Sequence, residues 1–360
     1  MVGLYIHIPF CKSKCGYCDF VSYTDRDSLK GKYIDAVTAE AAQYDGETAD
    51  TVFIGGGTPS TLDDGEISRL LDGVRNHISI ADGAELTIEA NPNSITAEKA
   101  AEYKNAGINR VSIGMQAAQE HLLREIGRTH TKDDFLRAVE TVKDAGIDNI
   151  SADMIYSLPG QTTAEAVETA ELLASLPLRH VSAYALKLER GVPMYGAEQP
   201  DEDADREMFH AVKDVLNSNG IMRYEISNFA RPGFECRHNL KYWRVEDYIG
   251  LGAAAHSCYK KERFANTEIL EKYIRKSGKK GGARTSALPV YDELFEKIML
   301  NTRLLEGMDA SLLPKEADNS LSMMEKNGIL MQKGGRIILT DKGLDLQNAV
   351  VIELTRFTSV

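Results

Sequence analysis

Three cysteines near the start of the chain have the spacing of cluster ligands. Cys11, Cys15 and Cys18 follow a short apolar run, with three and then two residues between them. Such a loop can bind three irons of a [4Fe–4S] cluster, whereas clusters that only transfer electrons usually take four cysteines. One iron would then stay open to another ligand, as in a catalytic metal site. The spacing therefore predicts an iron–sulfur protein with a reactive cluster.

Zinc and disulfide chemistry are the alternatives that the residues leave open. The chain has five cysteines, an odd number that fits a disulfide framework poorly. Zinc in a structural site needs four ligands in paired spacing, and His7 would point away from the cysteine loop if it lies on a strand. Two Cys and two His later in the chain would suffice for zinc, although their pairs are tightly spaced: Cys236, His238, His256 and Cys258.

The cysteine loop resembles the motif of the radical S-adenosylmethionine (SAM) superfamily. That motif is Cys-x3-Cys-x2-Cys with an aromatic residue before the last cysteine, here Tyr17. The resemblance implies that the open iron takes the amino and carboxylate groups of SAM. It also implies that one electron cleaves SAM to methionine and a 5′-deoxyadenosyl radical.

Strand-like and helix-like segments alternate from residue 4 to about residue 190. Strands separated by helices of ten or more residues indicate parallel β/α units, and six in series predict a full or partial barrel. The fold expected is α/β, with a partial (β/α)6-type barrel of the radical SAM kind. The strands are expected at 4–8, 51–54, 86–89, 110–113, 149–155 and 180–186, and the helices at 28–44, 65–77, 96–105, 119–126, 132–144 and 164–173.

Glycines and polar residues stand where the expected strands end, which is the face that carries the chemistry of β/α barrels. The segments 55–58, 89–92, 112–116, 127–130 and 153–161 resemble the radical SAM branch that contains oxygen-independent coproporphyrinogen III oxidase. This resemblance implies a SAM pocket lined by Tyr5, Tyr17, Gly56, Gly57, Thr58, Glu89, Gln116, Arg128 and Asp153. A carboxylate suits the ribose hydroxyls or the ammonium group of SAM, and an arginine suits its carboxylate.

Two departures argue against coproporphyrinogen III oxidase activity. Phe20 stands where the decarboxylating enzyme has a further cysteine, two residues after the third. Only Met1 to Gly3 precede the first expected strand, whereas that enzyme has a long segment that closes over its site. We therefore expect no decarboxylation of coproporphyrinogen III.

The segment His238-Asn239-x-x-Tyr242-Trp243, followed by Gly250-Leu-Gly-Ala-Ala-Ala-His256, resembles the HemW group of haem chaperones. The resemblance implies haem as ligand and client haemoproteins as recipients. His238 is the predicted axial ligand, and Tyr242 and Trp243 offer flat surfaces to the porphyrin. For His238, the alternative is a residue that only forms hydrogen bonds in the core. For the whole protein, the alternative is a radical SAM methyltransferase or decarboxylase that acts on a tetrapyrrole or another substrate.

Composition limits the remaining functions. The net charge is 42 − 54 = −12, which argues against a general nucleic-acid binder. No apolar run approaches the ~20 residues of a membrane span, and no signal peptide is recognised. Free cysteines and an oxygen-labile motif predict the cytoplasm. Peripheral membrane contact and a homodimer stay open.

Three regions are expected along the chain. Residues 1–265 form the core, with the haem segment near 223–258, and residues 266–285 form a basic, glycine-containing linker. Residues 286–360 form a small, mainly helical C-terminal domain of winged-helix character, with helices at 291–304 and 321–328.

Overall fold

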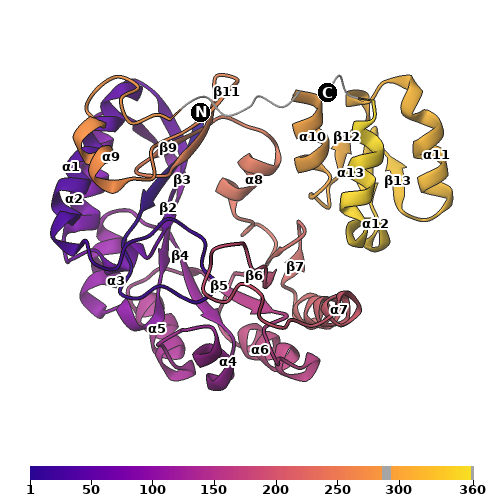
Figure 1. Cartoon of the computed structure of the whole chain (residues 1–360), viewed down its shortest axis with the longest axis horizontal. Helices are drawn as coiled ribbons and strands as arrows, with labels where there is room; N and C mark the ends of the chain where they lie inside the picture. The colour runs from indigo at the N-terminus through magenta and orange to yellow at the C-terminus, as the bar shows by residue number, and fades with distance from the viewer. Residues whose placement is uncertain (286–292, 358–360) are drawn as a thin grey trace.

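The computed structural model describes residues 1–285 and 293–357. A curved sheet carries helices on its outer face, and a smaller unit lies beside the open side of that curve (Figure 1). The helix predicted from Tyr291 starts outside the described residues and is seen from Glu293 onward.

Six parallel strands form the middle of the sheet in the order of the sequence. They are β1 (Val2–Ile8), β2 (Thr48–Gly56), β3 (Ser79–Ala90), β4 (Arg110–Gln116), β5 (Asn149–Tyr156) and β6 (His180–Ala185). The helices of these units are α1 (Lys30–Ala41), α2 (Glu66–Arg75), α3 (Ala97–Asn105), α4 (Glu120–Glu125), α5 (Lys132–Asp144) and α6 (Thr163–Ser175). This series confirms the predicted β/α architecture.

Helix starts follow the local sequence. Thr96 accepts a hydrogen bond from the Lys99 amide and caps α3. Thr131 and Thr162 each form a capping box at the start of α5 and α6. Such caps satisfy amide groups that the first helical turn leaves unbonded, so the threonines fix where the helices begin.

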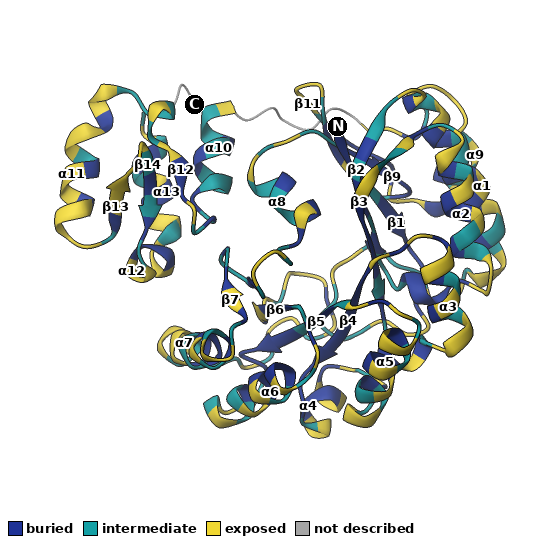
Figure 2. Ribbon diagram, turned by 180° about the vertical axis from the view of Figure 1, so that it is seen from behind, coloured by how far each residue is buried: buried dark blue, intermediate teal, exposed yellow. Residues whose placement is uncertain are grey.

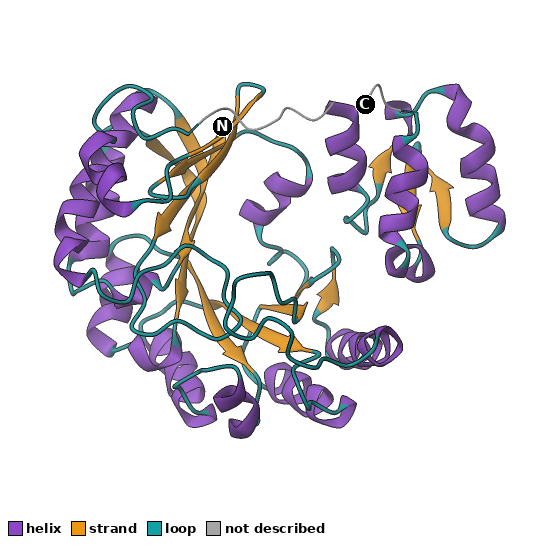
Figure 3. Ribbon diagram, in the orientation of Figure 1, coloured by secondary structure: helices purple, strands orange, loops and turns teal. Residues whose placement is uncertain are grey.

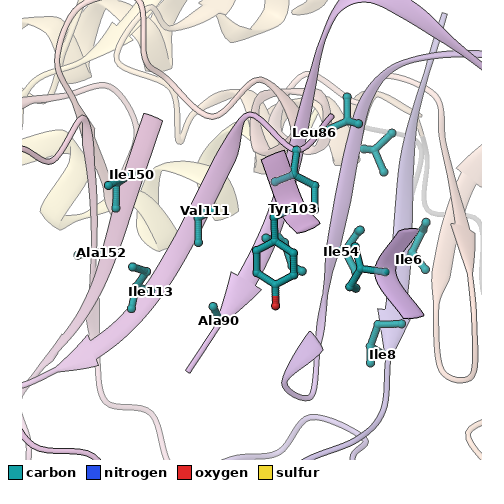
Figure 4. Close-up of a cluster of buried hydrophobic side chains, with 14 of the residues drawn as sticks. Ile6, Ile8, Ile54, Leu86, Ala90, Tyr103, Val111, Ile113, Ile150 and Ala152 are labelled. Carbon is teal, nitrogen blue, oxygen red and sulfur yellow. The ribbon is translucent and has the colours of Figure 1, made fainter. Parts of the chain in front are cut away.

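The main core lies between the sheet and its outer helices. Side chains of a strand point alternately to its two faces, and one face of each strand is apolar. Ile6, Ile54, Val111 and Ile150 contribute to this layer with at most 1% exposure (Figure 4). In Figure 2 the helices are buried toward the sheet and exposed on the outside. The other face of the strands is left free to line the inside of the curve.

Short strands extend the sheet beyond the six parallel ones. On one side β9 (Tyr248–Leu251) pairs parallel with β1, followed by antiparallel β10 (His256–Tyr259) and β11 (Glu262–Ala265). On the other side β8 (Asn228–Ala230) pairs antiparallel with β6, and β7 (Met222–Arg223) pairs antiparallel with β8. The described sheet runs from β11 to β7, so its two edges do not meet.

Two helices of the barrel side were not predicted from the sequence pattern. Helix α7 (Glu202–Ser218) packs against α6, and α8 (Arg237–Trp243) lies inside the curve of the sheet (Figure 1). Residues 266–285, expected to form a linker, contain α9 (Leu270–Lys276). Leu270 and Tyr273 are fully buried in the main core, so part of the expected linker packs on it.

The C-terminal unit has a hydrophobic core of its own. It consists of α10 (Glu293–Asn301), α11 (Asp318–Lys326), α12 (Asp341–Asp345), α13 (Gln347–Thr355) and a sheet ordered β12 (Met308–Asp309), β14 (Arg336–Leu339), β13 (Leu330–Lys333) (Figure 3). None of the described helices is long and apolar enough to cross a membrane.

Candidate functional site

The cysteine loop is held in place by backbone hydrogen bonds. The Cys11 amide donates to the Tyr23 carbonyl at 3.0 Å, and the Gly16 amide donates to the Ile126 carbonyl at 3.1 Å. A third bond, from the Cys18 amide to the Cys15 carbonyl, closes the turn at 3.2 Å. The three thiols therefore stay together at the end of β1.

The three cysteines line one cavity together with the C-terminal ends of β2 to β5. This "cluster cavity" contains all the predicted SAM residues but one: Tyr17, Gly56, Gly57, Thr58, Glu89, Gln116, Arg128 and Asp153. The exception, Tyr5, does not line this cavity and faces two neighbouring ones. The parallel strands thus bring to one place side chains that lie up to 142 positions apart (153 − 11).

Glycine is required at the end of β2 because the chain passes close to its neighbours. At Gly56 the φ angle is +108°, and an added Cβ would lie 2.4 Å from the His7 ring. At Gly57 an added Cβ would lie 2.8 Å from the Ile8 carbonyl oxygen. A larger residue would push this wall away from the cysteine loop.

Two carboxyl groups share the floor of the cluster cavity. Burial first, and then the charge of Asp153, raise the pKa of Glu89 to about 8. Burial also raises the pKa of Asp153, although Ser112 donates a hydrogen bond to it at 3.2 Å. A cationic ligand would favour the ionised form of both groups, which suits the ammonium or sulfonium charge of SAM.

Arg128 faces the cysteine loop. Its Nη2 donates to the Gly114 carbonyl at 2.9 Å, and its Nη1 lies 3.7 Å from Cys15 Sγ. Its Nε donates to His130 Nδ1 at 3.3 Å. These contacts hold a guanidinium group where it could bind the carboxylate of a ligand on the cluster.

The donor set fits a cluster better than a single ion. In the described part of the chain, no three His, Cys, Asp or Glu side chains converge on one metal position. A [4Fe–4S] cluster spreads three cysteine ligands over three irons, so the thiols need to share a cavity rather than a point. The four side chains of the zinc alternative do not meet at one point, since no such group of ligands occurs in the described residues. Cys236 is buried against Glu85, whereas His256 is exposed.

A second cavity, of about 610 Å³, lies beside α8. This "aromatic cavity" is lined by Tyr5, His7, Phe20, Tyr242, Trp243, Tyr248 and His256, and on its far side by Met299 and Leu300 of α10. Two of the three predicted haem residues, Tyr242 and Trp243, therefore share one cavity. His256, which the sequence places in a glycine-rich segment, lies there too and is exposed.

His238 does not line the aromatic cavity in this structure. It is 0% exposed, and its Nδ1 and Nε2 are hydrogen-bonded to Thr51 Oγ1 and to the Tyr242 hydroxyl, both at 2.8 Å. Its ring stacks on Phe53 with centroids 5.4 Å apart. Burial, and then the nearby Lys241, lower its pKa to about 3. Thr51, which holds the His238 ring through this hydrogen bond, was not predicted as a site residue, because its contact with His238 arises only from packing.

A third cavity, of about 290 Å³, lies inside the curve of the sheet between the other two. This "inner cavity" is lined by Tyr5, Phe20, Phe53, Gly56, Glu89, Arg110, Ser112, Asp153, Ser182, Tyr184, Asn239 and Tyr242. Glu89 and Asp153 also line the cluster cavity, and Tyr5 and Tyr242 also line the aromatic cavity. Arg110 was not predicted as a site residue; its only signal in the sequence is a charge at the start of an apolar strand.

Comparison with known proteins identifies close relatives over most of the chain. The model of the radical SAM superfamily matches residues 5–173. The protein named heme chaperone HemW from Lactococcus lactis is 33% identical, over 96% of this chain and 95% of its own length. The protein of the same name from Escherichia coli is 36% identical, over 85% of this chain and 83% of its own length. The one from Synechocystis is 37% identical, over 91% of this chain and 82% of its own length.

The whole chain also aligns with a solved structure. Coproporphyrinogen III oxidase (HemN) from Escherichia coli, described as a radical SAM enzyme, aligns with a TM-score of 0.85. The alignment covers 100% of this chain and 90% of that one, at 22% sequence identity. At this identity the likeness supports the fold alone, and the expected radical SAM architecture is confirmed.

Proposed function

Since the chain belongs to the family of heme chaperones named HemW, within the radical SAM superfamily, we propose that it binds haem and transfers it to client haemoproteins. The observation that carries the proposal is the aromatic cavity. Tyr242 and Trp243 bring flat apolar surface to a space of about 610 Å³ that also contains an exposed imidazole.

Cys11, Cys15 and Cys18 would hold a [4Fe–4S] cluster, and the cluster cavity would hold SAM. When bound, the cluster supplies electron transfer and an open iron for SAM. The chain's own residues bind and orient SAM: Glu89 and Asp153 meet its positive charge, and Arg128 meets its carboxylate. Free thiols and such a cluster require a reducing environment, which makes the cytoplasm the proposed location.

His238 stays the predicted axial ligand of haem. The structure places His238 and His256 differently with respect to the aromatic cavity. His238 can reach the aromatic cavity only if it breaks its hydrogen bond with Tyr242. His256 already lines the cavity. A neutral imidazole is the form that coordinates iron, and the low pKa of His238 keeps that ring neutral.

Haem titration of the anaerobically reconstituted protein tests the function. We expect a Soret band, moderate affinity, and transfer to an added apo-haemoprotein, because a carrier must release its ligand. His238→Ala and His256→Ala are compared, and the variant that alters the Soret band identifies the axial ligand. Light scattering of the haem-free and haem-loaded protein in the same series tests for a homodimer.

A parallel assay with coproporphyrinogen III separates the proposal from its enzyme alternative. We expect no protoporphyrinogen IX when SAM and reductant are present, since Phe20 replaces the extra cysteine. Absence of haem transfer together with turnover of the tetrapyrrole would reject the chaperone function.

A further inference from the structure

Arg110 is a buried cation whose guanidinium group is not fully hydrogen-bonded within the part of the chain that the structure describes. It begins β4, its exposure is 2%, and its Nε and Nη1 have no hydrogen-bond acceptor among the described residues. Buried polar groups are normally bonded, and an unpaired buried charge costs several kcal/mol. The Arg110 guanidinium group therefore needs an acceptor.

The carboxyl groups around Arg110 are engaged elsewhere. The oxygens of Glu85 accept hydrogen bonds from the Arg237 and His238 amides at the start of α8, each at 3.1 Å. Asp153 accepts from Ser112, and Glu89 accepts from the Gly56 amide at 3.1 Å. Glu85 and Asp153 interact electrostatically with Arg110, but none of the three carboxyl groups accepts a hydrogen bond from it.

The Arg110 side chain reaches the inner cavity. Polar groups of Ser112, Ser182 and Asn239 line the same space. Its volume of about 290 Å³ suits a small acid or one arm of a larger molecule, not a whole porphyrin. Arg110 stands six residues before Gln116 on β4, about 20 Å along the strand, so it lies deeper than the strand ends that line the cluster cavity.

The inner cavity adjoins the aromatic cavity. Tyr5, Phe20 and Tyr242 contribute to the walls of both. A porphyrin in the aromatic cavity would therefore have its edge beside the space that Arg110 lines. Haem carries two propionate arms that end in carboxylates.

We propose that the inner cavity binds a carboxylate, with Arg110 as its cationic partner. The planar guanidinium fork matches the geometry of a carboxylate. The carboxylate is either a haem propionate, which rests on the proposed function, or that of a small free acid.

The wild-type protein alone allows the first test. With cluster and SAM bound throughout, so that SAM cannot be the carboxylate observed, the affinities of haem and haem dimethyl ester are compared. A propionate source predicts roughly tenfold weaker binding of the ester, as expected for a lost charge-assisted bond. A free-acid source predicts equal haem affinities and binding of 13C-propionate, measured by saturation-transfer NMR.

Variants then assign the effect to Arg110. We expect Arg110→Met to abolish the ester difference or the propionate signal, and Arg110→Lys to retain part of it. Arg237→Met is the matched control, because Arg237 donates to the Gly83 carbonyl outside the inner cavity. Thermal unfolding checks that each variant folds. If Arg110→Met does not fold, the wild-type comparison of haem with its ester, together with the propionate measurement, still decides whether the inner cavity binds a carboxylate.

Equal affinity of haem and its ester, together with no propionate signal, would overturn the proposal. So would an ester difference or a propionate signal that persists in folded Arg110→Met. Failure of haem itself to bind would instead reject the proposed function, and the propionate measurement would still decide the inner cavity.

Discussion

The cysteine loop and helix α8 carry the two strongest motifs of the chain, and they behave differently in the structure. The three thiols are brought together by a turn of eight residues, 11–18, and all line the cluster cavity. In α8, Tyr242 and Trp243 face the aromatic cavity while His238 is turned into the core. A motif whose geometry is local can be interpreted from spacing, whereas one whose geometry depends on distant partners cannot.

Removing all three thiols should produce the largest effect. We expect Cys11/Cys15/Cys18→Ala to lose nearly all of the about four irons per chain expected for a cubane. A Cys236/Cys258→Ala variant is the control, since these cysteines lie outside the cluster cavity. Anaerobic iron and sulfide analysis measures both, and retention of iron in the triple variant would contradict the cluster assignment.

Loss of a carboxylate in the cluster cavity should weaken SAM binding. We expect Glu89→Gln and Asp153→Asn each to lower SAM affinity by roughly tenfold or more, since a charge-assisted bond contributes about 1.5–3 kcal/mol. Calorimetry on the reconstituted protein measures this. Glu98→Gln, on the exposed first turn of α3, is a matched control. Unchanged affinity in the Glu89/Asp153 double variant would exclude this SAM pocket.

Tyr242→Phe tests the difference between the two regions most directly. The Tyr242 hydroxyl occupies Nε2 of the predicted ligand His238. Its removal should raise haem affinity by up to about tenfold, the value of one hydrogen bond. Tyr248→Phe removes a hydroxyl from the same cavity without touching His238. A Tyr242→Phe protein with unchanged binding, and a Soret band that depends on His256, would assign the ligand to His256.

The raised pKa of Glu89 predicts a pH dependence of stability without SAM. The folded-state pKa of Glu89 is about 8, so the folded chain keeps this proton up to about pH 8, whereas the unfolded chain loses it near the ordinary glutamate pKa of 4.5. Between these values the folded state binds more protons, so stability falls as pH rises, by at most about 1.4 kcal/mol per unit. Denaturant unfolding should show a shallower decline in Glu89→Gln, and an identical slope would contradict it.

The smallest effect should come from the contact between α8 and the C-terminal unit. The Arg303 guanidinium lies over the Trp243 ring, 4.3 Å from its centroid. A cation–π contact contributes about 0.5–1 kcal/mol at such sites, so Arg303→Ala should weaken haem binding by roughly two- to fivefold. Because Arg303 also pairs with the fully buried Glu225, haem affinity is compared only after thermal unfolding shows that the variant folds. Arg356→Ala, which removes an exposed ion pair with Glu353, is the control. Equal effects of the two changes would show that the contact with Trp243 is irrelevant to haem.

Periodicity and spacing explain what could be predicted from the sequence. The six parallel strands and the helices between them follow from local patterns, because each β/α unit carries its own apolar alternation and its own turn. The residues of the cluster cavity were predicted from the resemblance to the radical SAM family, together with the expectation that the strand ends meet at one face. The edge strands β7 to β11 have two to four residues, too few for a clear pattern. Parallel pairing of β9 with β1 joins Tyr248 to Gly3, 245 positions apart (248 − 3), and no local signal predicts it.

The burial of His238 and the isolation of Arg110 were unpredictable for the same reason. His238 is fixed by Thr51 and by Glu85, whose side chain caps α8 from 153 positions away. The Glu85 carboxylate, which lies near Arg110, accepts hydrogen bonds from two amides of α8 instead. These are consequences of tertiary packing, which a pattern of residue types along one segment does not contain.

The aromatic cavity has walls from two separately packed units. Tyr242, Trp243 and His256 belong to the barrel side, while Met299 and Leu300 belong to α10 of the C-terminal unit, which has its own core. The affinity for a ligand in this cavity therefore depends on how the two units are positioned relative to each other. A change in the relative position of the two units would alter the contacts that a ligand makes in this cavity, while the cluster cavity, whose walls come from the barrel side alone, would keep its lining.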